Sequence, residues 1–175
     1  MYQLKEMIGE DKVNVALRKL IERFGYAEPP YPTAIDLVDV LREQTPADMQ
    51  YLLVDLFERI TLYDNRTTAT SYRELPDGQF EVTLDVSCKK LAVDANQLEV
   101  ETPMDDWIEI GAFASPPQGS KYGDTLHRQR VKVGPGDHQF KFTVTEPPHT
   151  AGIDPFFLLI DRMPKDNLKR TMLKN

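Results

Sequence analysis

The sequence has a single cysteine, Cys88, among 175 residues, so no internal disulfide can form. An alternating strand pattern surrounds it, with no adjacent base or glycine-rich turn, which favours a small buried hydrophobic side chain over a reactive thiol. No apolar run approaches the ~20 residues of a membrane span. The N-terminal MYQLKEMIGEDK also lacks the apolar region of a signal peptide. We expect a globular polypeptide whose compartment these features leave open.

Positive charge is also scarce. The sequence has 21 Lys and Arg residues against 28 Asp and Glu residues, which gives a net charge of -7. No local cluster of Lys and Arg offsets this excess. Such a surface repels phosphate backbones and anionic lipid. We therefore expect no nucleic acid partner and no direct membrane contact.

Histidine is limited to His127, His138 and His149. None lies in H-E-x-x-H, and no two are spaced i, i+4 as on one helix face. A zinc site built by these residues from different strands is one interpretation. The favoured one is that all three are surface residues near turns.

Other signatures of chemistry are weak. Glycine-rich phosphate loops and G-x-S-x-G are absent, so Ser71, Ser87, Ser115 and Ser120 have no recognisable partners. Two carboxylate pairs, Asp105 with Asp106 and Asp161 with Asp166, could hold calcium, but loop carboxylates more often are solvated or cap turns. Trp107 with Tyr122 could stack on a sugar, although a core or interface role is favoured. We assign no catalytic, cofactor-binding or metal-binding residue to this chain.

The first third of the chain predicts three or four short helices. Apolar residues recur at helical spacing in residues 2–8, 10–24, 33–44 and 46–60. Thr33 is a plausible N-cap, with Asp36 three residues later. Thr45 before Pro46 repeats that signal for the fourth helix.

After Asp64-Asn65 the apolar period changes from 3.6 to 2, which predicts strands. The expected features, in order, are an edge strand at 67–73, a turn at 76–78, strands at 80–86, 98–100 and 107–113, a loop at 115–125, a hairpin of 128–133 with 140–144, and a closing strand at 156–160. Within the closing region Asp154 is expected to cap a turn and Asp161 to pair with Arg162 or Arg128. The pattern predicts an α+β protein, with a helical bundle in residues 1–63 and an antiparallel, Ig-like β-sandwich in residues 64–175.

Two phrases of the sequence resemble a known family. Two segments resemble the helical tail that follows the zinc site in gluzincin aminopeptidases related to aminopeptidase N. They are YQLKEMIGEDKVNVALRKLIERFGY and PTAIDLVDVLREQTPADMQYLLVDLFERITLYDN. The ending D-P-x-x-x-x-I-D-R-x-P-x-D-N is similar to the C-terminal end of bacterial proteins in which such a peptidase is fused to an ABC transporter permease. The resemblance covers nearly the whole chain.

The resemblance implies a non-catalytic C-terminal fragment. H-E-x-x-H, the downstream zinc-binding Glu, G-x-M-E-N and the catalytic Tyr all lie upstream in that family, and Tyr2 is too close to I-G-E-D to match that Tyr. No catalytic residue is carried over, and zinc is expected in the parent protein and not in this chain. The implied partner is the catalytic domain of the same polypeptide. The parent is expected to be membrane-attached with an extracytoplasmic peptidase region, and Met1 to be an added or internal start.

Two other functions remain open. One is a module that binds a protein or glycan through the 115–125 loop, with the helices as a cap. The other is a small self-contained enzyme that uses the histidines. It ranks last because the sequence shows no recognisable arrangement of catalytic residues around them. Because an excised partner leaves apolar faces behind, we also expect self-association through the first and fourth helices.

Overall fold

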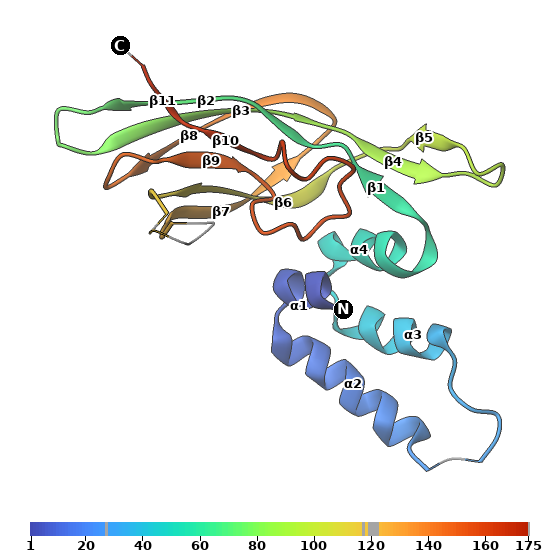
Figure 1. The fold of residues 1–175 in the computed structure, drawn as a ribbon. Coiled ribbons are helices and arrows are strands. Elements are labelled where there is room, and N and C mark those ends of the chain that lie inside the picture. Colours follow the sequence, from blue (N-terminus) through green and yellow to red (C-terminus); the bar gives the residue numbers. More distant parts are fainter. Residues whose placement is uncertain (27, 117, 119–122, 175) are drawn as a thin grey trace. The chain divides into compact units, whose positions relative to one another are not determined.

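The computed structural model describes residues 1–26, 28–116, 118 and 123–174. The chain divides into two compact units, Met1–Thr61 and Leu62–Asn175 (Figure 1). The first is helical and the second consists of β-sheets, which confirms the predicted α+β class. The boundary lies two residues before the predicted one, because strand β1 (Thr61–Tyr63) already begins there.

The helical unit contains α1 (Tyr2–Ile8), α2 (Glu10–Phe24), α3 (Ala34–Gln44) and α4 (Tyr51–Leu53). The predicted start of α3 is confirmed, since the Thr33 amide and hydroxyl both donate to Asp36 Oδ2, at 2.7 and 2.8 Å. These bonds lower the pKa of the Asp36 carboxyl. Leu41, Leu52 and Leu53 are buried in the core of this unit.

The prediction of one regular fourth helix begun by Thr45 is wrong. The Thr45 hydroxyl donates to the carbonyl of Leu41 at 2.8 Å, so Thr45 closes α3. The chain then forms a 3₁₀ turn at Ala47–Met49, α4, and a π-helical turn at Val54–Glu58. Within the π turn Asp55 is buried, and its carboxylate accepts from the Thr61 hydroxyl at 3.2 Å.

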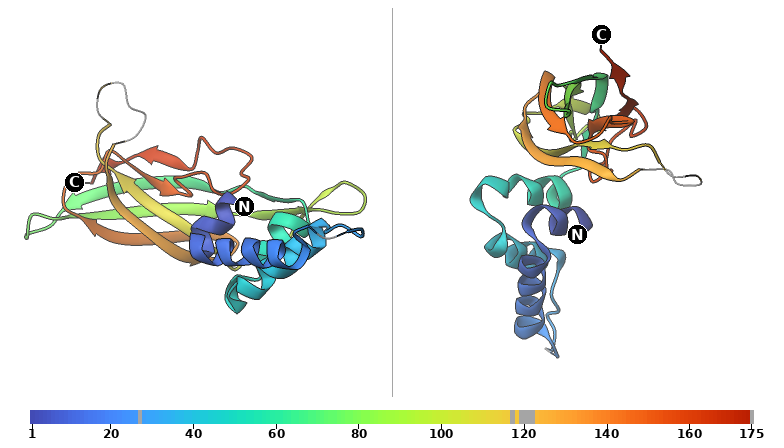
Figure 2. Two further views of the ribbon diagram at one scale, coloured as in Figure 1. Left: turned by 90° about the horizontal axis from the view of Figure 1, so that it is seen from below. Right: turned by 90° about the vertical axis from the view of Figure 1, so that its left-hand side faces the viewer.

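Two four-stranded sheets face each other in the second unit (Figure 2). One has the order β10-β9-β6-β7 and the other β11-β2-β3-β8, with a separate three-stranded sheet β1-β4-β5. The bounds are β2 Arg66–Glu74, β3 Phe80–Cys88, β4 Lys90–Val93, β5 Glu99–Glu101, β6 Asp106–Phe113, β7 Thr125–Val133, β8 Gly136–Val144, β9 Thr150–Ile153, β10 Leu168–Arg170 and β11 Met172–Leu173. The sandwich is as predicted, but the described residues hold eleven strands where six or seven were expected.

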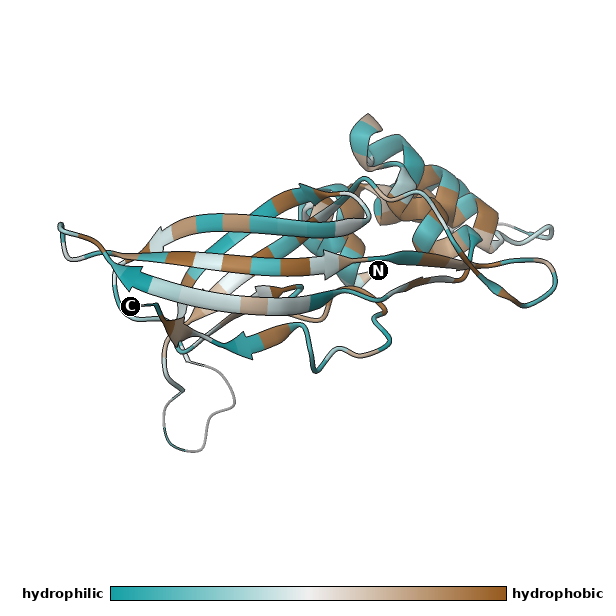
Figure 3. Ribbon diagram, turned by 90° about the horizontal axis from the view of Figure 1, so that it is seen from above, coloured by the Kyte–Doolittle hydropathy of each residue, from teal (hydrophilic) through white to brown (hydrophobic). Residues whose placement is uncertain are grey.

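The core lies between the two sheets. Hydropathy alternates along the long strands (Figure 3), and the inward positions of β3 and β6 are almost fully buried. Cys88 belongs to this core, with 2% of its surface exposed, so the predicted hydrophobic role is confirmed. Burial raises the pKa of its thiol to about 12.

The predicted hairpin of residues 128–133 and 140–144 is wrong. Strand β7 pairs with β6, whereas β8 pairs with β3 in the opposite sheet. The Gly134–Asp137 connection therefore carries the chain from one sheet to the other. Both strands have one apolar face, and a local pattern of that kind does not specify the partner strand.

Strand β2 was predicted to be an edge strand, and this is wrong as well. Strand β11 pairs in parallel with Ser71 and Tyr72, and the Thr67 amide donates to the carbonyl of Asp166 at 3.0 Å. The C-terminal segment thus covers the free side of β2. Strands β10 and β11 have three and two residues, which is too short for an alternation that a sequence pattern could reveal.

The predicted closing strand at Phe156–Ile160 is a loop. The strand of this region is β9, and the chain leaves it at Asp154, which has a φ of 42°. Phe156 and Ile160 are 38% and 62% exposed. A continuous apolar run is consistent with a buried strand, but here its side chains remain partly in solvent.

Gly152 should tolerate no side chain. It lies in β9 opposite Gly111 of β6, and an added Cβ would lie 1.9 Å from the carbonyl oxygen of Asn167. We expect Gly152→Ala to lower the free energy of unfolding by about 1–3 kcal/mol, measured by urea denaturation, because β10 must move away. Gly134→Ala is the control, since its nearest atom, Met104 O, is at 3.6 Å. Equal losses in both variants would contradict this account.

Candidate functional site

The three histidines are half-buried. His127 stacks on Phe142 with ring centroids 4.0 Å apart, and burial lowers its pKa. His138 Nε2 lies 2.9 Å from the carbonyl oxygen of Gly134. Among the described residues no group of three or more His, Cys, Asp or Glu side chains could hold a metal ion. The histidines present do not fit a zinc centre, so we derive no step through zinc.

The pair Asp105 and Asp106 does not converge on one site. Asp105 is exposed and pairs with Lys132 at 2.7 Å. Asp106 is buried, and its Oδ2 lies 2.8 Å from both Lys90 Nζ and the Tyr63 hydroxyl. Lys90 is itself only 3% exposed. These three residues, from β6, β4 and β1, form a closed buried network with a structural role.

The proposed sugar-stacking pair is only partly described. Trp107 is half-buried on β6, while Tyr122 lies outside the described residues. The same holds for much of the 115–125 loop. The glycan-binding hypothesis therefore stays a prediction from the sequence.

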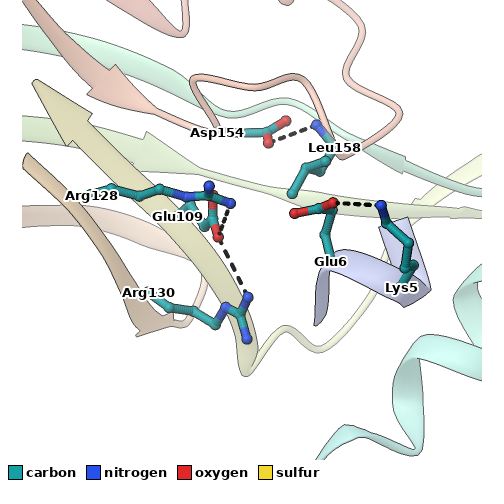
Figure 4. A network of polar contacts seen from close by, with 7 residues as sticks. All are labelled: Lys5, Glu6, Glu109, Arg128, Arg130, Asp154 and Leu158. Carbon is teal, nitrogen blue, oxygen red and sulfur yellow. Dashed lines mark hydrogen bonds and ion pairs between the residues drawn. The ribbon is translucent and has the colours of Figure 1, made fainter. Parts of the chain in front are cut away.

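A charged cluster lies on the outer face of β6 (Figure 4). Glu109 is buried at 5% exposure, and Arg128 binds its carboxylate with two bonds of 2.9 Å. Arg130 adds a longer contact of 3.4 Å. The Arg128 guanidinium also lies 4.5 Å from the ring centroid of Phe156. The Lys5–Glu6 pair in the same figure belongs to α1 of the helical unit.

Asp154 links this cluster to the following loop. Its amide donates to the Glu109 carbonyl at 2.7 Å, and its carboxylate accepts from the amides of Leu158 and Leu159 at 2.9 and 3.1 Å. The predicted turn-capping role is thus confirmed. Burial, opposed by these two bonds and reinforced by nearby negative charge, raises the pKa of Asp154 to about 7.

The predicted partners of Asp161 are wrong. Arg128 binds Glu109 instead, and Arg162 pairs with Glu99. The Asp161 carboxylate accepts from the amides of Asn65 and Met163 at 3.0 and 2.8 Å. The alternation of Arg128 and Arg130 on β7 was the only signal for the Glu109 cluster, and the pairing of β6 with β7 had to be known to use it.

An apolar cavity of about 580 Å³ lies under the loop that follows Asp154. Its walls are Thr150, Phe157, Leu159, Ile160, Asp161, Pro164, Lys165 and Leu168. A smaller hollow of about 230 Å³ adjoins Phe113, Phe156 and Phe157. Phe157 has a φ of 54°, which is uncommon outside glycine and persists only where the surroundings hold it. Chemically this surface suits the binding of apolar groups.

The helical unit has an apolar hollow of its own. It measures about 330 Å³ and is lined by Ala34, Ile35, Leu37, Val38, Asp39, Arg42, Phe57 and Glu58. Ile21, Ile35 and Ile60 are 66%, 72% and 64% exposed. Both units thus present apolar side chains to solvent.

Comparison with known proteins adds no identification. No protein-family model matches the chain, and no curated protein matches it. Within the described residues no helix is long and apolar enough to cross a membrane.

Proposed function

We propose that this chain is the non-catalytic C-terminal part of a zinc aminopeptidase of the aminopeptidase N-like family, of the bacterial type fused to an ABC transporter permease. Its role is to support the catalytic domain. The observation that carries this proposal is the apolar surface of the helical unit, on the helices whose sequence resembles the tail of that catalytic domain. The catalytic zinc and its ligands would belong to the parent protein.

The helical unit supports the proposal through its exposed isoleucines. Ile21 and Ile35 lie in α2 and at the start of α3, and each leaves about two thirds or more of its surface in solvent. Burying such a side chain contributes about 1.5–3 kcal/mol. A helical unit that packs on a larger domain would use these positions as contacts.

The sandwich supports the proposal through the loop after Asp154. Phe156, Phe157, Ile160 and Met163 are 38–62% exposed next to the apolar cavity. The Asp154 carboxylate accepts from two amides of this loop, and the Arg128 guanidinium lies over the Phe156 ring. A prearranged apolar surface loses little conformational entropy when a partner covers it.

We expect the chain to bind a separately expressed catalytic domain from the same polypeptide. Ile35→Glu should weaken that complex at least tenfold, because it places a charge in the apolar contact, as measured by isothermal titration calorimetry. The matched control is Asp39→Glu, a charge-conserving change that also lines the hollow of the helical unit. An upstream sequence without H-E-x-x-H, or peptidase activity in the purified chain alone, would overturn the proposal. Self-association of the isolated chain, measured by light scattering, is the accompanying expectation.

A further inference from the structure

Two segments far apart in the chain run side by side in the sandwich unit. The Tyr63 amide donates to the carbonyl of Ile160 at 2.9 Å, and the Arg162 amide returns a bond of 3.0 Å to the carbonyl of Tyr63. Farther along, the Thr67 hydroxyl donates to the Asn167 carbonyl at 2.6 Å. These bonds bring residues 63–67 against residues 160–167.

Buried polar atoms gather between these segments. Asn65 and Asn167 are both 0% exposed, and the side-chain oxygen of each has no hydrogen-bond partner in the protein. The Asn167 side chain lies against the Asp161 carboxylate. Asp166 Oδ1 is buried and unpartnered in the same way. A buried polar group left unsatisfied loses its bonds to water without compensation and destabilises the fold. Such a concentration therefore points to a ligand that these atoms bind.

Negative charge is in excess at the same place. The Asp161 carboxylate lies beside the Asp166 carboxylate. Arg66 is the cation that faces both carboxylates, but its guanidinium is bound to Asp64 at 2.8 and 3.0 Å. Three carboxylates thus share one guanidinium.

Two further cations, Lys89 and Arg162, have other partners. Lys89 pairs with Glu101 at 3.1 Å, and Arg162 pairs with Glu99. Neither side chain therefore neutralises the negative charge of Asp161 and Asp166.

We propose that Asn65, Asp161, Asp166 and Asn167 bind a calcium ion. They offer carboxylate and amide oxygens, which are the hard ligands that Ca²⁺ takes, six to eight at a time, with carbonyls and waters completing the shell. Mg²⁺ suits the site less, because it demands a near-ideal octahedron and gives up its waters reluctantly. The ion would join segments 96 residues apart, as the bond from the Asn65 amide to Asp161 Oδ2 already does.

This site would fasten one end of the apolar loop. Asp161 lines the 580 Å³ cavity and also belongs to the proposed ligand set. Calcium is therefore expected to order the loop between Asp154 and Asn167. The proposal stands independently of the aminopeptidase assignment, because it uses only residues of this chain.

The test uses the full chain, dialysed against a chelator and then titrated with CaCl₂ by isothermal titration calorimetry. One ion should bind per chain, and a calcium concentration 100 times the Kd should raise Tm by about 5–10 °C. Asp166→Asn should weaken calcium binding at least tenfold, since it removes one ligand charge. Asp105→Asn changes an exposed acid outside the site and should leave the affinity unchanged.

A second variant, which leaves Asp166 unchanged, is expected to strengthen calcium binding. Asn65→Asp adds a carboxylate, so it should bind calcium more tightly and have a lower Tm than wild type when calcium is removed. Absence of binding heat and of a Tm shift in wild type would overturn the proposal, leaving buried water as the partner of these atoms. Wild-type affinity in Asp166→Asn, or equal affinity for MgCl₂, would overturn it too.

Discussion

Replacing Lys90 by methionine is expected to lower the free energy of unfolding by about 3–5 kcal/mol, because it leaves a buried carboxylate without its cation. Lys90 and Asp106 have side chains that are 3% and 5% exposed, and their charged atoms lie 2.8 Å apart. The Tyr63 hydroxyl would still donate to Asp106, but one neutral hydrogen bond does not replace the lost charge. Urea denaturation measures the loss.

The matched control for this prediction is Lys132→Met. Lys132 pairs with Asp105 at a similar distance of 2.7 Å, but their side chains are 42% and 75% exposed. Solvent screens such a pair, so its removal should cost less than about 1 kcal/mol. The double variant Lys90→Met/Asp106→Leu should recover much of the loss, because no buried charge remains. If Lys90→Met lowers the free energy of unfolding no more than Lys132→Met does, the buried pair of Lys90 and Asp106 does not stabilise the fold.

The second large effect is a pH dependence of stability that comes from Asp154. Burial raises the pKa of this carboxyl from 3.8 to about 7 in the folded chain. The folded state therefore holds a proton that the unfolded state has released, and stability falls as pH rises through 7. The contribution is fully present below about pH 4. Between pH 5 and pH 8 we expect it to decrease by roughly 2–3 kcal/mol.

Asp154→Asn isolates this contribution. Asparagine tolerates the φ of 42° at this position and cannot ionise. The difference in free energy of unfolding between wild type and Asp154→Asn should favour wild type most at pH 5 and least at pH 8, as measured by urea denaturation at each pH. Asp94→Asn is the matched control, because Asp94 also accepts from two backbone amides, those of Asn96 and Leu98, but at an exposed turn. A difference that stays constant with pH in Asp154→Asn would refute the assignment.

The elements that could be predicted are those specified by residues close together in the chain. The helices α1, α2 and α3 follow from apolar residues at 3.6-residue spacing, and the Thr33–Asp36 cap from a three-residue motif. Strand β3 follows from strict alternation, and its buried positions are as expected. Gly78 adopts a φ of 81° in the predicted turn.

The candidate site could not be predicted in the same way. Glu109 and Arg128 meet because β6 pairs with β7 in a register that places Gly111 opposite Arg128. Asn65 meets Asp161 because β1 and the 160–167 segment run together. Lys90 is buried because β4 places it against Asp106 of β6. Each of these contacts joins residues that are 16 or more positions apart.

The sequence by itself determined the α+β class, the order of helical unit and sandwich, most helix bounds and the long strand β3. These depend on the period of apolar side chains and on capping residues, which act over a few residues. Only the tertiary structure decided that β7 and β8 belong to opposite sheets, that the apolar run after Asp154 is a loop, and that residues 63–67 lie against residues 160–167. The reason is that strand partners and buried polar contacts are selected by the packing of the whole sandwich, which no local pattern encodes.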